Sequence, residues 1–142
     1  MNQKVLSKQL KNAGTETHLA NHGGEALDRL KQSTYWADPS SPYHGQKLNL
    51  GVVLMDQEMP VMDGLTCTRR IRELEKEGKL TGHVPIIAVT ANARAEQIEM
   101  TLKSGIDDVV SKPFRVGELV PKMKAFDAVA LVLAALSVPV EW

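Results

Sequence analysis

The sequence is short of cysteine, of net charge and of long apolar runs, and each shortage excludes a class of protein. Its single cysteine, Cys67, excludes an internal disulfide and fits a reducing compartment. Seventeen basic and seventeen acidic residues leave no formal net charge, so no overall electrostatic attraction favours nucleic acid or an anionic membrane. The apolar run at 128–136 is nine residues long, whereas a membrane-spanning helix needs about twenty. We therefore expect a cytoplasmic chain that binds no nucleic acid and does not insert into a membrane.

What the sequence contains is an alternation of helix and strand patterns within 142 residues, a length that suits one domain. Predicted helices are 2–13, 25–31, 65–77, 93–103 and 116–125, and predicted strands are 16–20, 52–56, 85–90 and 108–112. Strands that alternate with helices indicate an α/β fold, in which a parallel sheet carries helices on both faces. We divide the chain into a domain at 1–126 and an apolar C-terminal tail at 127–142, whose role is unknown.

Asp56 ends an apolar strand and stands just before a sharp turn. Open α/β sheets carry out their chemistry just outside the carboxyl ends of the strands, where an aspartate points into a cleft. Met59-Pro60 takes the chain out of extended pairing, and Asp63-Gly64 supplies a turn before the next helix. Taken alone, an aspartate at such a position is more often a turn or helix-capping residue than a nucleophile.

Two further strands end in side chains that can bind a phosphoryl group. The run at 85–90 ends on the hydroxyl of Thr90, and the run at 108–112 ends on the ammonium of Lys112. Because the carboxyl ends of parallel strands lie at one edge of a sheet, we expect these groups to converge with the carboxylate of Asp56. The carboxylate can attack phosphorus while the hydroxyl and the ammonium bind the equatorial oxygens. The ordered triplet favours phosphoryl chemistry.

Three motifs give the chain a resemblance to a known family. D-x-x-M-P-x-x-D-G at 56–64, V-T-A at 89–91 and S-K-P-F at 111–114 together resemble the receiver domain of response regulators, most closely the receiver modules of fungal hybrid histidine kinases. The resemblance implies a flavodoxin-like, doubly wound parallel sheet with the strand order 2-1-3-4-5. It also implies a phosphorelay receiver that takes a phosphoryl group from a phosphohistidine, and so a switch rather than a turnover enzyme. The implied partner is a histidine kinase or a histidine phosphotransfer protein.

The same resemblance gives roles to individual residues. It implies that Asp56 is the phosphoacceptor, Thr90 the switch hydroxyl and Lys112 the phosphate-binding lysine. A cis peptide bond would precede Pro113, which X-Pro bonds permit at small cost. Magnesium is the implied cofactor, with Asp56 and the backbone carbonyl of Glu58 as its remaining protein ligands.

The chain departs from the family pattern in two places. A receiver should begin with an apolar strand that ends in an acidic pair, but strand 1 is absent from this sequence, which starts inside the first helix. Without that pair we expect the affinity for Mg²⁺ to be weakened or lost. Loss of a central strand would also leave two facing strand edges unpaired, at a cost in stability. The second departure is Val109, where the family usually has an aromatic switch residue, so Thr90 could not couple to a ring rotation.

The missing strand leaves several hypotheses open. We favour the interpretation that Met1 is an internal methionine, over the alternative that a degenerate receiver truly begins there. A separate hypothesis is that the β-capable run at 128–136 occupies the vacant central place, beside the strands at 16–20 and 51–55. The simpler alternative is that this run extends the last helix or is a non-native tail.

Two other functions also stay open. A phosphatase of the haloacid dehalogenase type combines aspartate, hydroxyl and lysine on a parallel sheet, but it needs a second aspartate two residues after the nucleophile, where this chain has Glu58. A degenerate pseudo-receiver would keep the docking surface of the family without the metal and act as a protein-interaction module. Metal-dependent labelling of the chain separates both active hypotheses from the pseudo-receiver.

The segment 32–47 is longer than most connections between a helix and a strand, so we interpret it as an insertion. We expect its aromatic residues to pack onto the sheet edge rather than to form a docking surface: Tyr35, Trp36 and Tyr43. Elsewhere, Cys67 is expected to face the core, and Asp107 and Asp108 to form a solvated start of a strand.

Overall fold

The structure is a computed structural model that describes residues 3–12, 16–20, 23–33, 35–37, 51–56, 64–90, 94–111, 116–125 and 130–134. Helices and strands alternate along these residues, and their bounds agree with the sequence predictions to within two residues. The helices are α1 (Gln3–Asn12), α2 (Gly23–Lys31), α3 (Gly64–Lys76), α4 (Ala95–Lys103) and α5 (Val116–Lys124). The strands are β1 (Glu16–Ala20), β2 (Val52–Asp56), β3 (Ile86–Thr90), β4 (Asp108–Ser111) and β5 (Ala130–Ala134). No helix among the described residues is long and apolar enough to cross a membrane.

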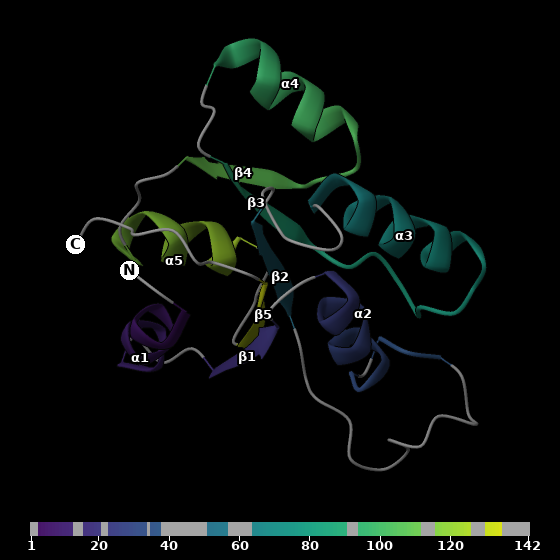
Figure 1. Cartoon of the computed structure of the whole chain (residues 1–142), viewed down its shortest axis with the longest axis horizontal. Coiled ribbons are helices and arrows are strands. Elements are labelled where there is room, and N and C mark those ends of the chain that lie inside the picture. Colours follow the sequence, from purple (N-terminus) through teal and green to yellow (C-terminus); the bar gives the residue numbers. More distant parts are fainter. Residues whose placement is uncertain are drawn as a thin grey trace.

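The strands form one sheet in the order β1-β5-β2-β3-β4 (Figure 1). Each pair of neighbours in this order runs parallel. β1, β2, β3 and β4 correspond to strands 2, 3, 4 and 5 of the family order 2-1-3-4-5. The predicted flavodoxin-like order is therefore confirmed. β5 takes the position of strand 1, between the edge strand β1 and β2.

β5 lies between β1 and β2 and pairs with both of them. The register runs from Glu16↔Ala130 to Ala20↔Ala134 on one side, and from Val52↔Leu131 to Met55↔Ala134 on the other. The hypothesis that the apolar run enters the vacant place is therefore confirmed for Ala130–Ala134. The expectation of two unpaired facing edges is wrong, because the backbone of β5 pairs with both edges. The division of the chain at residue 126 stays a prediction.

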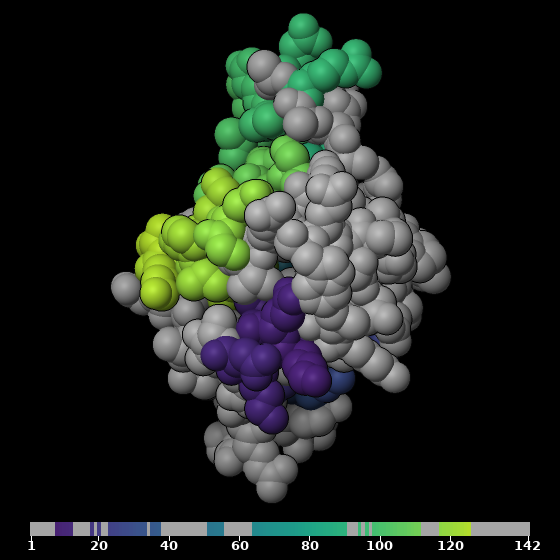
Figure 2. All heavy atoms as spheres, turned by 90° about the vertical axis from the view of Figure 1, so that its left-hand side faces the viewer, coloured from purple at the N-terminus to yellow at the C-terminus, as the bar shows by residue number. Residues whose placement is uncertain are grey.

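Helices cover both faces of the sheet, which explains why the inner strands are apolar without alternation. α1 packs against α5 on one face, and α2 packs against α3 on the other (Figure 1). Figure 2 shows α1 and α5 next to one another on the surface that they form. Every residue of β3 is buried, and Val52 to Met55 in β2 are at most 1% exposed.

The helical spacing of apolar residues predicts the buried face of α3 better than that of α4. Cys67, Ile71 and Leu74 of α3 are all buried, as expected. Leu102 of α4, which continues an apolar stripe in the sequence, is instead 43% exposed. The reason is the position of α4, which contacts the edge strand β4 and so buries only a narrow strip of its surface.

The described part of the insertion at 35–37 packs onto the connection between α3 and β3. Trp36 is 8% exposed and forms an antiparallel bridge with Leu80, while the backbone N–H of Thr81 donates to the carbonyl of Tyr35 at 2.7 Å. Trp36 belongs to the hydrophobic core, and Tyr35 packs against it. The predicted packing role is confirmed for these two aromatic residues, whereas Tyr43 lies outside the described residues.

Tyr35 makes the stability of this packing sensitive to high pH. Its hydroxyl donates to the carbonyl of Gly51 at 3.4 Å, and burial, with the charge of Glu75 as a smaller cause, raises the pKa of Tyr35 above its ordinary value of 10.0. The folded chain thus holds this proton more tightly than the unfolded chain. The stabilisation is fully present below about pH 10 and is lost as the pH rises through the raised pKa.

We therefore expect the free energy of unfolding to fall less steeply above pH 10 in Tyr35→Phe than in the wild type. Urea denaturation at a series of pH values measures this slope. Tyr43→Phe, a change at the only other tyrosine in the sequence, is measured alongside to separate the effect of Tyr35 from that of removing any one tyrosine. Equal slopes for Tyr35→Phe and the wild type would contradict the assignment.

Candidate functional site

The carboxyl ends of the strands bring the predicted polar positions to one edge of the sheet. Asp56 is the last residue of β2, Thr90 of β3 and Ser111 of β4. Asp56 is in register with Val89, and Thr90 with Ser111. Asp56 and Thr90 are therefore one residue apart in register, on neighbouring strands that lie about 4.8 Å from each other. The structure places carboxylate and hydroxyl positions together as the strand pattern predicts, and their chemical roles stay predictions.

Lys112 follows the last residue of β4 directly in the sequence, so its backbone leaves the sheet at the same edge. Lys112 itself, Pro113 and Glu58 lie outside the described residues. The place of the ammonium, the peptide bond before Pro113 and the carbonyl of Glu58 therefore stay predictions. Thr90 is 9% exposed, so the residue is largely buried at the end of β3.

Val109 stands where the family usually has an aromatic residue. It is half-buried in β4, in register with Ala88 of β3, and packs against the hydrophobic core. A valine has no ring to turn between the core and the surface. An aromatic ring rotation at this position is therefore absent from this chain.

The last residues of the five described strands are the residues that the sheet itself brings to this edge. In sheet order they are Ala20, Ala134, Asp56, Thr90 and Ser111. Of these described strand ends, only Asp56 carries a carboxylate, the kind of ligand through which proteins hold Mg²⁺ in its near-octahedral oxygen shell. Among the described residues no group of three histidine, cysteine or acidic side chains could hold a metal ion.

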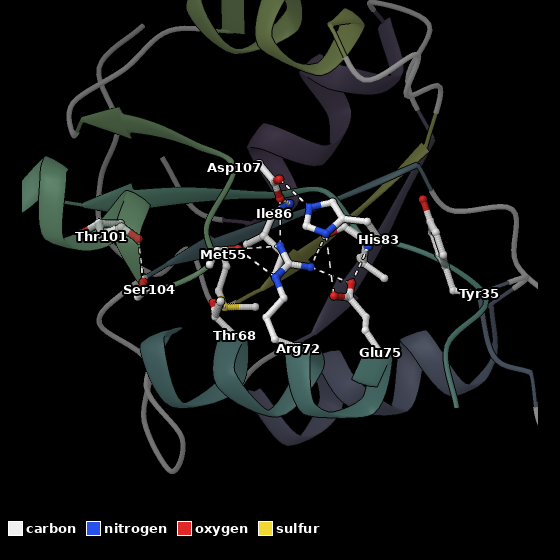
Figure 3. A network of polar contacts seen from close by, with 12 residues as sticks. Tyr35, Met55, Thr68, Arg72, Glu75, His83, Ile86, Thr101, Ser104 and Asp107 are labelled. Atoms are coloured by element: carbon white, nitrogen blue, oxygen red, sulfur yellow. Dashed lines mark hydrogen bonds and ion pairs between the residues drawn. The ribbon is translucent and has the colours of Figure 1, made fainter. Parts of the chain in front are cut away.

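A second polar cluster, centred on Arg72 of α3, was not predicted from the sequence (Figure 3). The guanidinium donates to the carbonyl of Gly105 through Nη2 at 2.6 Å and Nε at 2.8 Å, and to the carbonyl of Val84 at 2.8 Å. It also forms ion pairs with Glu75 at 2.7 Å and with Asp107 at 2.9 Å. The five N–H donors of the planar guanidinium are suited to such convergent binding.

The two carboxylates of this cluster also bind the backbone at the start of β3. Glu75 accepts from the N–H of Val84, and Asp107 accepts from the N–H of Ile86, both at 2.7 Å. The second oxygen of Asp107 lies 2.6 Å from Nε2 of His83 (Figure 3). The cluster thus fastens α3 to the amino ends of β3 and β4, the opposite end of the strands from Asp56. We interpret it as structural.

The expectation that both aspartates at the start of β4 are solvated is wrong for Asp107. Its side chain is 18% exposed because it lies between Arg72 and the backbone of β3. Asp108 is 37% exposed and forms an ion pair with Lys122 at 3.2 Å. From the sequence, only the pair of Arg72 and Glu75 could have been predicted, because these residues are three apart on one helix.

Comparison with known proteins gives the same family as the motifs. The model of the response regulator receiver domain family matches residues 1–124. Hybrid signal transduction histidine kinase I of Dictyostelium discoideum is 40% identical over 114 residues, which are 80% of this chain and 6% of that protein. The sensor histidine kinase RcsC of Escherichia coli K12 is 37% identical over 113 residues, again 80% of this chain and 10% of that protein. The chain therefore spans only a small part of these relatives.

Solved structures with the same fold include two that bear on the site. One is the receiver domain of a sensor histidine kinase from Pseudomonas aeruginosa PAO1, which was solved with a magnesium ion coordinated in its active site cleft. It is 31% identical to this chain with a TM-score of 0.66, and the match covers 88% of this chain and 87% of that one. The other is a co-crystal structure of the Saccharomyces cerevisiae histidine phosphotransfer protein Ypd1 with the receiver domain of the response regulator Ssk1. It matches at 25% identity and a TM-score of 0.71, and the match covers 88% of this chain and 80% of that one.

Proposed function

The chain belongs to the response regulator receiver domain family, and from this premise we propose that it takes part in a phosphorelay by accepting a phosphoryl group on Asp56. The observation that carries the proposal is the position of Asp56 at the carboxyl end of β2, one residue out of register with Thr90 at the end of β3. A nucleophile and a hydroxyl donor at adjacent strand ends suit transfer of a phosphoryl group.

In the proposed reaction a carboxylate oxygen of Asp56 attacks the phosphorus of a phosphohistidine on the partner. A P–O bond forms and the P–N bond breaks, and the imidazole nitrogen keeps the electron pair and takes up a proton. The products are an acyl phosphate on Asp56 and a free histidine. Thr90 and Lys112 bind the phosphoryl oxygens during transfer, which offsets their negative charge. Attack of water on phosphorus later releases phosphate and restores the carboxylate, so the chain acts as a switch rather than as a turnover enzyme.

The proposed partner is a histidine kinase or a histidine phosphotransfer protein. The Ypd1 complex supports this choice, because its Ssk1 receiver domain is bound to a phosphotransfer protein. The kinase relatives support a place for this chain as the receiver module of a hybrid histidine kinase. We propose that it works in the cytoplasm, without binding nucleic acid and without inserting into a membrane.

The proposed magnesium ligands are Asp56 and the backbone carbonyl of Glu58, with a cis peptide bond before Pro113 shaping the neighbouring loop. The Pseudomonas structure supports the choice of ion for the family. With one carboxylate among the five strand ends, we propose that this chain binds Mg²⁺ more weakly than a receiver with an acidic pair. The same shortage supports a second candidate function, that of a pseudo-receiver that docks to partners without being phosphorylated.

The mass of the intact chain after incubation with magnesium and acetyl phosphate tests the main proposal. We expect a gain of one phosphoryl group per chain, which is lost again at alkaline pH because acyl phosphates hydrolyse there. A phosphorylated histidine phosphotransfer protein should serve as donor as well. If neither donor changes the mass of the folded chain, the phosphoacceptor role is wrong and the pseudo-receiver stands.

A further inference from the structure

An interior strand of this sheet, β5, comes from the C-terminal part of the chain. β1 is an edge strand whose one neighbour in the sheet is β5, so its backbone reaches the other strands only through β5. β5 in turn pairs with β2 over four residues, from Val52 to Met55. Without β5, the sheet would separate into the single strand β1 and the group β2-β3-β4. The apolar edge of β2, buried in the structure, would lose its partner.

The carboxyl end of β5 lies beside the carboxyl end of β2, and the sequence of β5 is apolar throughout. Ala134, the last residue of β5, is in register with Met55, one residue before Asp56. The five residues of β5 are Ala, Leu, Val, Leu and Ala, with no acidic side chain among them. On its other side Asp56 is in register with Val89 of β3, one residue before Thr90. The strands next to Asp56 thus end on a threonine in β3 and on an alanine in β5.

We propose that β5 replaces an acid-bearing central strand, so that it completes the receiver sheet while leaving Asp56 without a second carboxylate. In the pattern that the motifs resemble, one strand both fills the centre of the sheet and supplies an acidic pair. In this chain β5 completes the sheet but carries no acidic pair. The cation part of this inference rests on the proposed function of Asp56, whereas the folding part does not.

Two truncations test the folding part. Removal of residues 126–142 takes away β5, and removal of residues 137–142 leaves β5 in place and serves as the control. We expect the longer truncation to lose its cooperative urea transition and the amide protection of β1 and β2, and the shorter one to keep both. A synthetic peptide of residues 126–136 should restore the transition. If the longer truncation unfolds at the wild-type urea concentration, β5 is not the strand that completes the fold.

Acidic residues introduced directly after β5 test the cation part. Ala135→Asp combined with Leu136→Asp places a carboxylate pair at the carboxyl end of this strand, and Ala135→Asn combined with Leu136→Asn is the uncharged control of the same size. We expect the aspartate variant to bind Mg²⁺ on the order of tenfold more tightly than the wild type, and the asparagine variant to match the wild type. Titration calorimetry with Mg²⁺, and line broadening by Mn²⁺ in NMR spectra, measure this affinity.

Two further variants make the cation test specific. Adding Asp56→Asn to the aspartate variant should remove the gain in affinity, which shows that the new carboxylates act together with Asp56. Ala135→Asp alone repeats the test with a single change. If the wild type already binds Mg²⁺ as tightly as the aspartate variant, the cation part is wrong. Neither readout uses a phosphodonor, so a failure of phosphorylation would overturn the proposed function and leave both results in place.

Discussion

Asp56→Asn is expected to abolish the gain of a phosphoryl group from either donor. Asparagine has nearly the same size and shape as aspartate, so the register of β2 with β3 at this position should be kept. Its amide lacks the negative charge and the nucleophilic oxygen that attack on phosphorus requires. The loss should thus be complete, while the urea transition of the variant stays cooperative. Intact mass after incubation measures the effect.

Asp108→Asn is the matched control for this prediction. This variant makes the same change from aspartate to asparagine, but at the start of β4, at the opposite end of the strands from Asp56. The half-exposed carboxylate of Asp108 pairs with Lys122 there. We expect this variant to gain one phosphoryl group at the wild-type rate. A phosphoryl group on Asp56→Asn would show that another residue is the acceptor.

Arg72→Ala is expected to lower the free energy of unfolding by about 3 kcal/mol, because it removes one partner from a largely buried ionic cluster. The side chains of Glu75 and Asp107 are only 16% and 18% exposed, so each would keep a charge with reduced compensation. The carbonyls of Gly105 and Val84 would lose their guanidinium donors as well. Urea denaturation near neutral pH measures the loss.

Arg70→Ala, on the same helix, is the matched control. Arg70 pairs with Glu73 at 3.2 Å and with Glu77 at 3.8 Å, and all three side chains are more than 40% exposed. Exposed pairs of this kind contribute about 0.5 kcal/mol or less. Arg72→Lys should be intermediate, because an ammonium cannot reach both carboxylates and two carbonyls in the arginine fork. Equal losses for Arg70→Ala and Arg72→Ala would show that the cluster does not stabilise the fold.

Helices and strands with a clear apolar periodicity could be predicted from the sequence. β5 could not be predicted firmly, because its structure depends on the rest of the sheet. Cys67, Ile71 and Leu74 recur at helical spacing, and the burial of α3 follows from that alone. The run that contains β5 is apolar throughout, and such a run suits a buried strand and a buried helix equally well. What decides for a strand is a vacant place between β1 and β2, which is a property of the assembled sheet.

The same distinction holds for the polar residues. Asp56 and Thr90 were predictable as neighbours because each ends an apolar strand, and parallel strands bring their ends together. Arg72 and Asp107 are 35 residues apart in the sequence, and nothing local links them. Arginines on the surface of a helix are usually solvated, so only the assembled structure reveals that Arg72 is fixed between two carboxylates.

The place of β5 also determines the order in which the protein can fold. β1 lies near the start of the chain, yet its strand partner is more than a hundred residues away, so the pairing of Glu16 with Ala130 closes a very long loop. Contacts of this range slow folding, because the entropy of closing the loop is lost before the contacts form. During synthesis on the ribosome, β1 and β2 are complete while β5 is still to be made, and their apolar edges have no partner in the meantime. The nascent chain should therefore be most prone to aggregate before β5 emerges, and it should gain its native sheet only afterwards.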